Sequence, residues 1–109
     1  MGVVLKDLRR HQRLLIPEGR KIMAESAHPL LSGTVSVIGL GGMFIRTKNT
    51  HSCGTVLRLK LVDPFVVFEA ECTVRNVAEN GLGVEITGIT FENEKRLKTL
   101  LLHLKPQAS

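Results

Sequence analysis

The chain has 109 residues, which corresponds to one small domain with a modest core. Hydrophobic residues make up 43% of it, but there is no Trp or Tyr and only four Phe residues, so the core must be mainly aliphatic and aromatic base-stacking platforms are nearly absent. Fifteen Lys and Arg residues against ten Asp and Glu give a formal charge of +5. This charge favours an anionic partner without choosing among nucleotide, nucleic acid, acidic protein and lipid.

Short strand-like runs separated by turn residues come first, and one helix-like segment ends the chain, an order that predicts a small β domain with an appended helix. The expected strands are residues 20–25, 33–38, 43–47, 55–62, 65–77 and 82–89. The first two can pair across the turn at His28 and Pro29, because the residue before a proline is disfavoured in the helical region. Asn80 and Gly81 form a hairpin signal between the last two strands.

The segment 91–104 has the pattern of an amphipathic helix. Its apolar face is formed by Leu97, Leu100, Leu101 and Leu104. Glu92 and Glu94 lie early, where they complement the helix dipole, Thr90 can cap the start, and Pro106 should stop the helix. We expect this helix to cover the open end or face of the sheet, and a dimer interface is the less favoured use.

The start of the chain has no long apolar core before its first charges, so it does not read as a secretory signal. No apolar run approaches the length of a membrane span, and Lys6 stands where a myristoylation motif needs Ser or Thr. We therefore expect a cytoplasmic protein without membrane insertion, in which Cys53 and Cys72 stay reduced. The expected role of both cysteines is that of small buried hydrophobic side chains.

Two segments are suited to anion recognition. One is the arginine cluster Arg9, Arg10 and Arg13, and the other is a glycine-rich turn that contains Gly39, Gly41 and Gly42. Guanidinium groups make forked hydrogen bonds with phosphate or with the edge of a guanine, and glycines let a ligand approach the backbone. From composition alone, a solvated basic segment is the favoured explanation of the arginines, and a hairpin turn is the commonest use of such glycines.

The sequence shows no catalytic apparatus. Ser, His and Asp occur without a nucleophile motif, and the acidic residues lack the spacing of an acid and base pair. His51 and Cys53 are possible metal ligands, but no second pair matches them and no structural zinc site is predicted. We therefore expect neither an enzyme nor a protein with a metal or cofactor. A small barrel that binds nucleic acid ranks last, because it lacks stacking aromatic residues.

The arginine cluster, together with the order of strands and helix, resembles the PilZ domain family of bacterial cyclic di-GMP receptors. The family opens with Arg-x-x-x-Arg, which Arg9 and Arg13 match, and residues 81–86 followed by Phe91 and the helix look like its final strand and helix. The resemblance implies a mainly β fold, a small six-stranded antiparallel β-barrel with a C-terminal α-helix. It implies a flexible N-terminal arm at 1–19, the barrel and helix at 20–105, and a tail at 106–109.

The second motif of the family is Asp or Asn, any residue, Ser, two residues and Gly. It falls on Val37, Gly39 and Gly42, so only the last glycine matches. In the family the first two of these side chains help to hold a guanine, so Val37 removes an acceptor and Gly39 removes a hydroxyl, each hydrogen bond being worth roughly 1.5 to 3 kcal/mol. Ser36 offers a hydroxyl one residue upstream, but only if the strand register shifts.

The resemblance implies two alternative functions. The first is a regulatory module for second-messenger signalling, in motility or biofilm formation, that binds cyclic di-GMP, orders its N-terminal arm and so creates a surface for an unidentified protein partner. Its implied ligand-binding residues are Arg9, Arg10, Arg13, Ser36, Gly39 and Gly42. The second is a divergent PilZ domain without nucleotide that acts as a protein-interaction module in pilus assembly or motility. The arginines favour the first, and Val37 and Gly39 favour the second.

Overall fold

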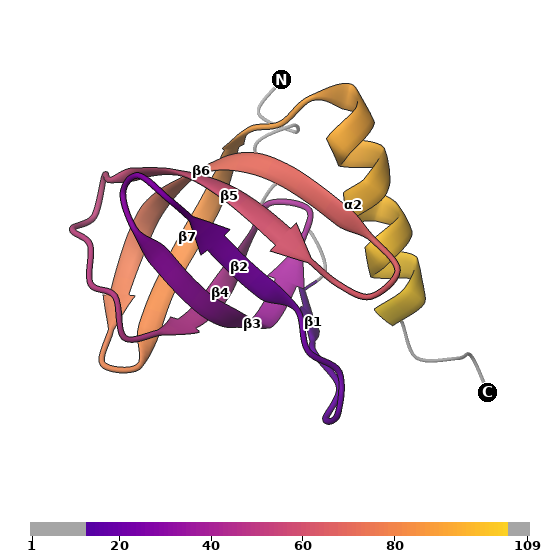
Figure 1. Cartoon of the computed structure of the whole chain (residues 1–109), viewed down its shortest axis with the longest axis horizontal. Helices are drawn as coiled ribbons and strands as arrows, with labels where there is room; N and C mark the ends of the chain where they lie inside the picture. The colour runs from indigo at the N-terminus through magenta and orange to yellow at the C-terminus, as the bar shows by residue number, and fades with distance from the viewer. Residues whose placement is uncertain (1–12, 105–109) are drawn as a thin grey trace, which may run out of the picture.

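The computed structural model describes residues 13–104 and contains seven strands and one helix (Figure 1). In chain order these are β1 (Arg13–Leu15), β2 (Met23–Ser26), β3 (Leu31–Gly39), β4 (Gly42–Thr47), β5 (Val56–Val62), β6 (Val67–Ala78), β7 (Gly81–Gly88) and α2 (Phe91–Leu104). Within these residues, no helix is both long and apolar enough to cross a membrane.

Six of the strands close into an antiparallel barrel. Around the barrel the order is β3, β2, β5, β6, β7 and β4, and β4 pairs back with β3. Every strand in the ring therefore has two neighbours, which leaves the ring without a continuous free edge. Figure 1 shows α2 at one end of the barrel, beside the hairpin of β5 and β6. The six-stranded barrel with a C-terminal helix is the fold that the family resemblance implies.

The strand β1 was not expected from the sequence. Its three residues pair with residues 37–39 of β3. They lie along the same edge of β3 as β2, which pairs with residues 31–34. The strand β1 lies inside the segment 1–19 that we expected to be a flexible arm, and residues 13–15 of this segment pair with β3. Three residues with one half-buried side chain, Leu14, are too few to show an alternating pattern.

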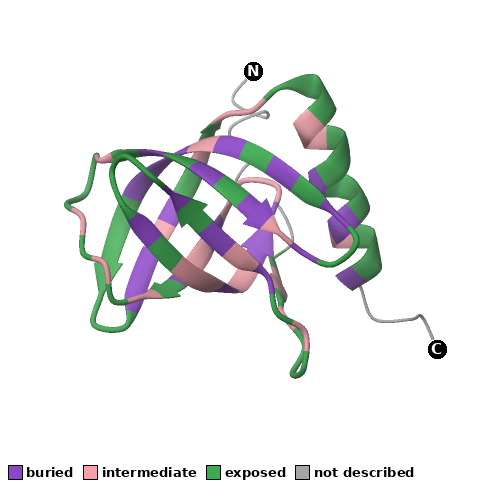
Figure 2. Ribbon diagram, viewed as in Figure 1, coloured by how far each residue is buried: buried purple, intermediate pink, exposed green. Residues whose placement is uncertain are grey.

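The core is aliphatic and follows the strand alternation that the sequence predicts. In β5 the leucines at 57, 59 and 61 are buried, whereas Arg58 and Lys60 are exposed. The same purple and green alternation runs along the first part of β6 (Figure 2), after which Cys72, Thr73 and Val74 are all buried. One face of each barrel strand thus fills the interior, and the opposite face carries polar groups to the surface.

The two cysteines, both free, lie in different environments. Cys72 is buried as expected, and desolvation by burial, with a smaller contribution from the charge of Glu71, raises the pKa of its thiol to about 12. Cys53 is exposed in the loop between β4 and β5, next to Gly54, whose φ of 95° favours glycine. The prediction that both cysteines are buried is therefore wrong for Cys53, which lies in a turn and not in a strand.

The helix begins where the sequence predicts. The backbone N–H of Asn93 donates to Thr90 Oγ1 at 3.1 Å, and the N–H of Glu94 donates to the Thr90 carbonyl oxygen at 2.8 Å. Arg96 Nη1 donates to the carbonyl oxygen of Val67 at 3.3 Å, which ties the helix to the start of β6. The buried helical residues are Leu97, Leu100 and Leu104, while Leu101 is only half-buried at the edge of the core. Pro106 lies outside the described residues.

A buried ion pair joins the segment after β1 to the end of β5. Asp63 is only 2% exposed, and it accepts hydrogen bonds from Arg20 Nε and Nη2 at 3.0 and 3.2 Å and from the Phe65 N–H at 3.0 Å. Burial by itself raises the pKa of the Asp63 carboxyl, but the hydrogen bonds from Arg20 and Phe65 and the charge of Arg20 outweigh it. The pKa of Asp63 is therefore lowered from its ordinary value of 3.8.

The helix packing can be tested with two leucines. We expect Leu100→Ala to lower the free energy of unfolding by about 2–5 kcal/mol, because it removes a fully buried side chain and leaves a cavity. Leu102 is 70% exposed, so Leu102→Ala should change the stability by less than about 0.5 kcal/mol. Urea unfolding followed by circular dichroism measures both, and equal losses in the two variants would contradict the packing of α2.

The ion pair predicts a particular dependence of stability on pH. Because the folded pKa of Asp63 lies below 3.8, its stabilisation is complete above the unfolded pKa and is lost as the pH falls through the folded pKa. Asp63→Asn should thus cost about 1.5–3 kcal/mol at neutral pH, and the difference from the unaltered protein should shrink in acid. Urea midpoints across the acid range measure it, with the exposed Glu69→Gln as control. A difference that stays constant with pH would refute this role.

Candidate ligand-binding site

The register of the sheet brings Arg13 beside the glycine-rich turn. Arg13 is the partner of Gly39 across β1 and β3, and residues directly opposite each other point to the same face. The next pair, Leu14 and Ile38, belongs to the core, so Arg13 lies on the outward face of the sheet and is exposed, whereas Gly39 itself is buried. The other two predicted arginines, Arg9 and Arg10, lie outside the described residues.

The turn between β3 and β4 is short and fixed to β7. Only two residues separate the strands, and the last paired residues, Ile38 and Met43, are both buried. Gly39 and Gly42 flank the turn, and Gly39 is buried while Gly42 is half-buried. The N–H of Ile86 donates to the carbonyl oxygen of Gly41 at 2.9 Å, which holds the turn against β7. Gly39 and Gly42 together are called the glycine strip below.

An exposed ion pair lies on the far side of the glycine strip. Glu85 of β7 is the partner of Gly42, and its Oε1 accepts a hydrogen bond from Arg75 Nε at 2.7 Å. The side chains of Arg75 and Glu85 are 55% and 48% exposed, so the pair is open to solvent. The glycine strip thus lies between Arg13 on β1 and the ion pair of Arg75 and Glu85 on the strands beyond β4. Neither Arg75 nor Glu85 was singled out by the sequence analysis.

The position of the lost acidic residue is apolar. Val37 is the partner of Leu15 on one side and of Phe44 on the other, and both Val37 and Phe44 are half-buried. The ring of Phe44 covers Gly81, since a Cβ atom at Gly81 would lie 2.8 Å from Phe44 Cε2. Phe44 was also missed by the sequence analysis, because an aromatic residue in a strand reads as part of the core.

Ser36 lies at a β-bulge. The pairing of β3 with β4 shifts register between Val35 and Val37 and leaves Ser36 without a partner on β4. Two residues instead of one therefore separate the inward-facing Val35 and Ile38, so Ser36 and Val37 share the outward side. The carbonyl oxygen of Ser36 accepts a hydrogen bond from the Ile16 N–H at 2.9 Å. The structure thus contains a local register shift of the kind that the use of the Ser36 hydroxyl requires.

Gly42 has a structural reason to be glycine. A Cβ atom there would collide with the carbonyl oxygen of Val84 and would come within 3.2 Å of the Cα of Glu85. A left-handed backbone is not the reason, since within residues 13–104 only Gly19 and Gly54 have positive φ. The one glycine that matches the second motif is thus required by the close approach of β4 to β7, whatever its contact with a ligand.

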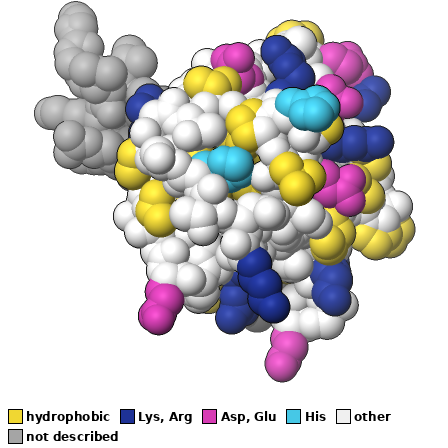
Figure 3. Space-filling view, turned by 60° about the vertical axis from the view of Figure 1, so that its left-hand side comes forward, with side chains coloured by type: hydrophobic (Ala, Val, Ile, Leu, Met, Phe, Trp, Pro, Cys, Tyr) yellow, Lys and Arg dark blue, Asp and Glu magenta, His cyan; other side chains and the backbone are white. Residues whose placement is uncertain are grey.

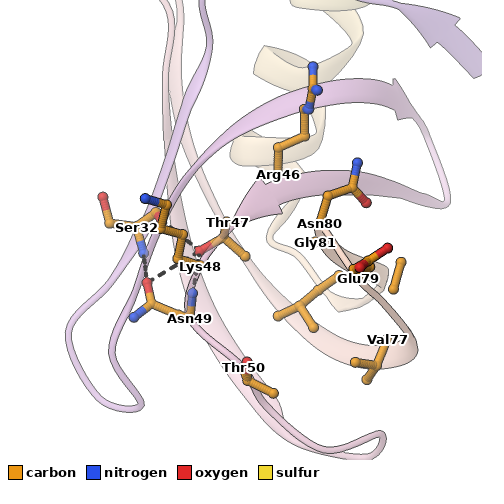
Figure 4. Close-up of a pocket in the computed structure, with 12 residues that line it drawn as sticks. Ser32, Arg46, Thr47, Lys48, Asn49, Thr50, Val77, Glu79, Asn80 and Gly81 are labelled. Atoms are coloured by element: carbon orange, nitrogen blue, oxygen red, sulfur yellow. Dashed lines mark hydrogen bonds between the residues drawn. The ribbon is translucent and has the colours of Figure 1, made fainter.

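A hollow on the described surface lies at the other end of β4. It has a volume of about 720 Å³ and opens between the β4–β5 loop and the turn from β6 to β7 (Figure 4). Its polar side chains fix the loop: Thr47 Oγ1 donates to the Ser32 carbonyl oxygen at 2.8 Å, and Asn49 Oδ1 accepts from the Ser32 N–H at 2.9 Å. Charges of both signs are interspersed over this end of the barrel (Figure 3). Of the predicted ligand-binding residues from Arg13 onward, none lines this hollow.

The potential metal ligands of the sequence are not brought together. His51 Nε2 lies 2.7 Å from the carbonyl oxygen of Leu30, and Cys53 is exposed. Among residues 13–104, no group of three or more His, Cys, Asp or Glu side chains is placed to hold a metal ion.

The structural role of Gly42 gives a stability prediction. Gly42→Ala should lower the free energy of unfolding by about 1–3 kcal/mol, because the added methyl group forces β4 away from β7. The matched control is Gly88→Ala on the same sheet, where the nearest atom is the flexible end of the Glu71 side chain at 3.0 Å. Thermal unfolding compares the two. A stable Gly42→Ala protein would show that the strands separate without cost and would refute the packing argument.

Solved structures of other proteins share this fold. The PilZ domain of YcgR from Escherichia coli, solved with c-di-GMP, superposes with a TM-score of 0.73 at 14% identity, over 88% of this chain and 90% of that one. MrkH, described as a c-di-GMP-dependent transcription regulatory factor, has a TM-score of 0.71 at 15% identity, over 88% of this chain and 50% of its own. The chain likewise spans 45% of the longer YcgR structure in complex with c-di-GMP, with a TM-score of 0.72 at 16% identity.

These identities are low, so the superpositions show the shared fold and nothing finer. No curated protein sequence matches the chain significantly. The family model of the PilZ domain, however, matches residues 7–103, which is most of the chain and includes both the arginine cluster and the final helix. The chain belongs to the PilZ domain family.

Proposed function

We propose that this PilZ domain is a regulatory module that binds cyclic di-GMP between its arginine cluster and the glycine strip. The observation that carries the proposal is the pairing of Arg13 with Gly39, which places the end of the first motif directly against the second. YcgR, a structural neighbour, is solved with c-di-GMP. The remaining contacts to such a ligand are mainly charge-assisted, because Arg13 contributes a guanidinium group while Val37 and Gly39 contribute no polar side chain.

The ligand contacts would be unequal on the two sides of the site. Arg13 is exposed and faces the strip, so its guanidinium group can reach a phosphate, and Arg9 and Arg10 precede it in the chain. The glycine strip lets the ligand approach the backbone, and Ser36 at the bulge adds a hydroxyl. We expect weaker binding than in members with the complete second motif, since each missing hydrogen bond is worth roughly 1.5 to 3 kcal/mol.

Signalling would act through the N-terminal segment. The strand β1 is held to β3 by only three residue pairs, so a ligand that contacts both Arg13 and the turn adds to a weak pairing. Stabilising β1 orders the chain that precedes it and changes the surface offered to a protein partner. In this proposal the module is cytoplasmic, has no catalytic function, and acts through the ligand and that partner, without binding nucleic acid.

A second function is favoured by one observation. Val37 and Phe44 form an apolar pair where the family motif places a polar side chain. An apolar surface of this kind suits a protein contact better than a guanine edge. The alternative is therefore a divergent PilZ domain that does not bind the nucleotide and acts as an interaction module in pilus assembly or motility.

Calorimetric titration with cyclic di-GMP separates the two functions. We expect the unaltered protein to bind, and we expect Arg13→Ala to lose most of that binding, because Arg13 lies beside the glycine strip. The control is Arg58→Ala, which removes the same charge from β5 on another part of the barrel. Raising the salt concentration should weaken binding, because added salt shortens the Debye length from about 8 to 10 Å at physiological ionic strength and so screens exposed charge contacts.

Three results would decide against the proposal. No heat and no amide shift at high ligand concentration would favour the interaction module. Equal binding by Arg13→Ala would place the site elsewhere, and equal losses in Arg13→Ala and Arg58→Ala would show that only net charge matters.

A further inference from the structure

The exposed pair Arg75 and Glu85 lies at the candidate site without a clear structural purpose. Glu85 is directly opposite Gly42, and its carboxylate is about half exposed, as is the guanidinium group of Arg75. Exposed ion pairs of this kind contribute little to folding stability, so stability alone does not account for a hydrogen bond of 2.7 Å at this position.

The pair also has unused hydrogen-bonding capacity. The bond joins Arg75 Nε to Glu85 Oε1, and among the described residues no other hydrogen bond is made by either side chain. Glu85 Oε2 therefore remains an acceptor, and the terminal nitrogens of Arg75 remain donors. An acceptor and a donor are thus held side by side on the surface, next to a strip that has no side chains.

The position of the pair matches the end of the site that a base would occupy. Arg13 lies on β1 and Glu85 lies on β7, with β3 and β4 between them. Three strand spacings separate the two positions, which is about 14 Å across the sheet. A cation at one side can hold a phosphate, whereas a carboxylate would repel a phosphate but can accept N–H groups. The charges of the site thus assign its two sides to different parts of a nucleotide.

We propose that Glu85, oriented by Arg75, recognises a guanine base of the ligand and so takes over the acceptor role that Val37 cannot fill. Guanine presents two N–H donors, at N1 and N2, next to the O6 acceptor. The carboxylate of Glu85 can accept from the two donors while Arg75 donates to O6. Adenine presents one N–H donor, at N6, beside its N1 acceptor, so it leaves one of the two contacts with the carboxylate unmade and should bind more weakly than guanine. This inference rests on the proposed function, and it adds the residues that select the base.

The test compares two cyclic dinucleotides on the full chain. Calorimetric titrations with cyclic di-GMP and with cyclic di-AMP are made on the unaltered protein, on Glu85→Gln and on Arg75→Gln. The control is Glu25→Gln, which removes the same charge from the exposed face of β2, on another part of the barrel. Amide spectra of each variant confirm that it is folded, and both altered side chains are exposed, so folding should be kept.

We expect Glu85→Gln to weaken cyclic di-GMP binding by about tenfold or more, as for loss of one well-placed base contact. Cyclic di-AMP binding should be unchanged or slightly stronger, so the ratio of the two affinities falls. Arg75 acts partly by positioning Glu85, so Arg75→Gln should lower the same ratio, which loss of a merely structural ion pair would not do. Glu25→Gln should leave the ratio as it is.

The outcomes separate this inference from the proposed function. If the unaltered protein binds cyclic di-GMP and Glu85→Gln keeps the same affinity ratio, the base-recognition role is wrong and the receptor function stands. If Glu85→Gln binds both dinucleotides more tightly by the same factor, Glu85 only repels phosphate, and the role is again wrong. If the unaltered protein binds neither dinucleotide, the receptor function fails and the role of Glu85 fails with it.

Discussion

The close approach of β4 to its two neighbours is the constraint on which the rest of the structure depends. A Cβ atom at Gly42 would meet the Val84 carbonyl oxygen of β7, one at Gly81 would meet the Ile45 carbonyl oxygen of β4, and one at Gly33 would meet the Arg46 carbonyl oxygen. Side chains are therefore missing where β4 closes the barrel between β3 and β7. At the turn the same closure fixes Gly42, so one of the two residues of the glycine strip is a consequence of how the barrel closes.

This origin separates the residues that the fold needs from those that a ligand needs. Gly42 is fixed by strand packing and matches the family motif, whereas Val37 and Gly39 depart from it and do not belong to the hydrophobic core. Changes at outward positions alter the hydrogen bonds offered to a ligand and leave the core of the barrel intact. A PilZ domain can thus lose polar motif residues and remain stably folded. Such a domain can then either contact the ligand through other residues or lose ligand binding.

Much of the fold could be predicted from the sequence, because burial of one strand face imposes an alternation of apolar and polar residues along each strand. The leucines of β5 alternate with Arg58 and Lys60, and α2 shows both its cap and its apolar face. β1 could not be predicted, since its three residues depend on pairing with a distant strand. Arg13 and the glycines were found by motif. Glu85 and Arg75 were not, because their place beside Gly42 follows from registers, including bulges between β6 and β7, that no local pattern encodes.

The ion pair of Arg20 with Asp63 limits how a change at β1 can spread. Arg20 follows β1 closely, is hydrogen-bonded to the buried Asp63 and lies 5.7 Å from the ring centroid of Phe65. The Phe65 ring in turn lies 6.2 Å from the His103 ring of α2, centroid to centroid, in a tilted arrangement. Moving Arg20 would leave a buried carboxylate without its partner, which is costly. In the proposed function, rearrangement on ligand binding would therefore be confined to the chain before Arg20, and the helix would stay fixed. The surface proposed to change with the ligand would then include β1, which pairs with β3 beside the glycine strip.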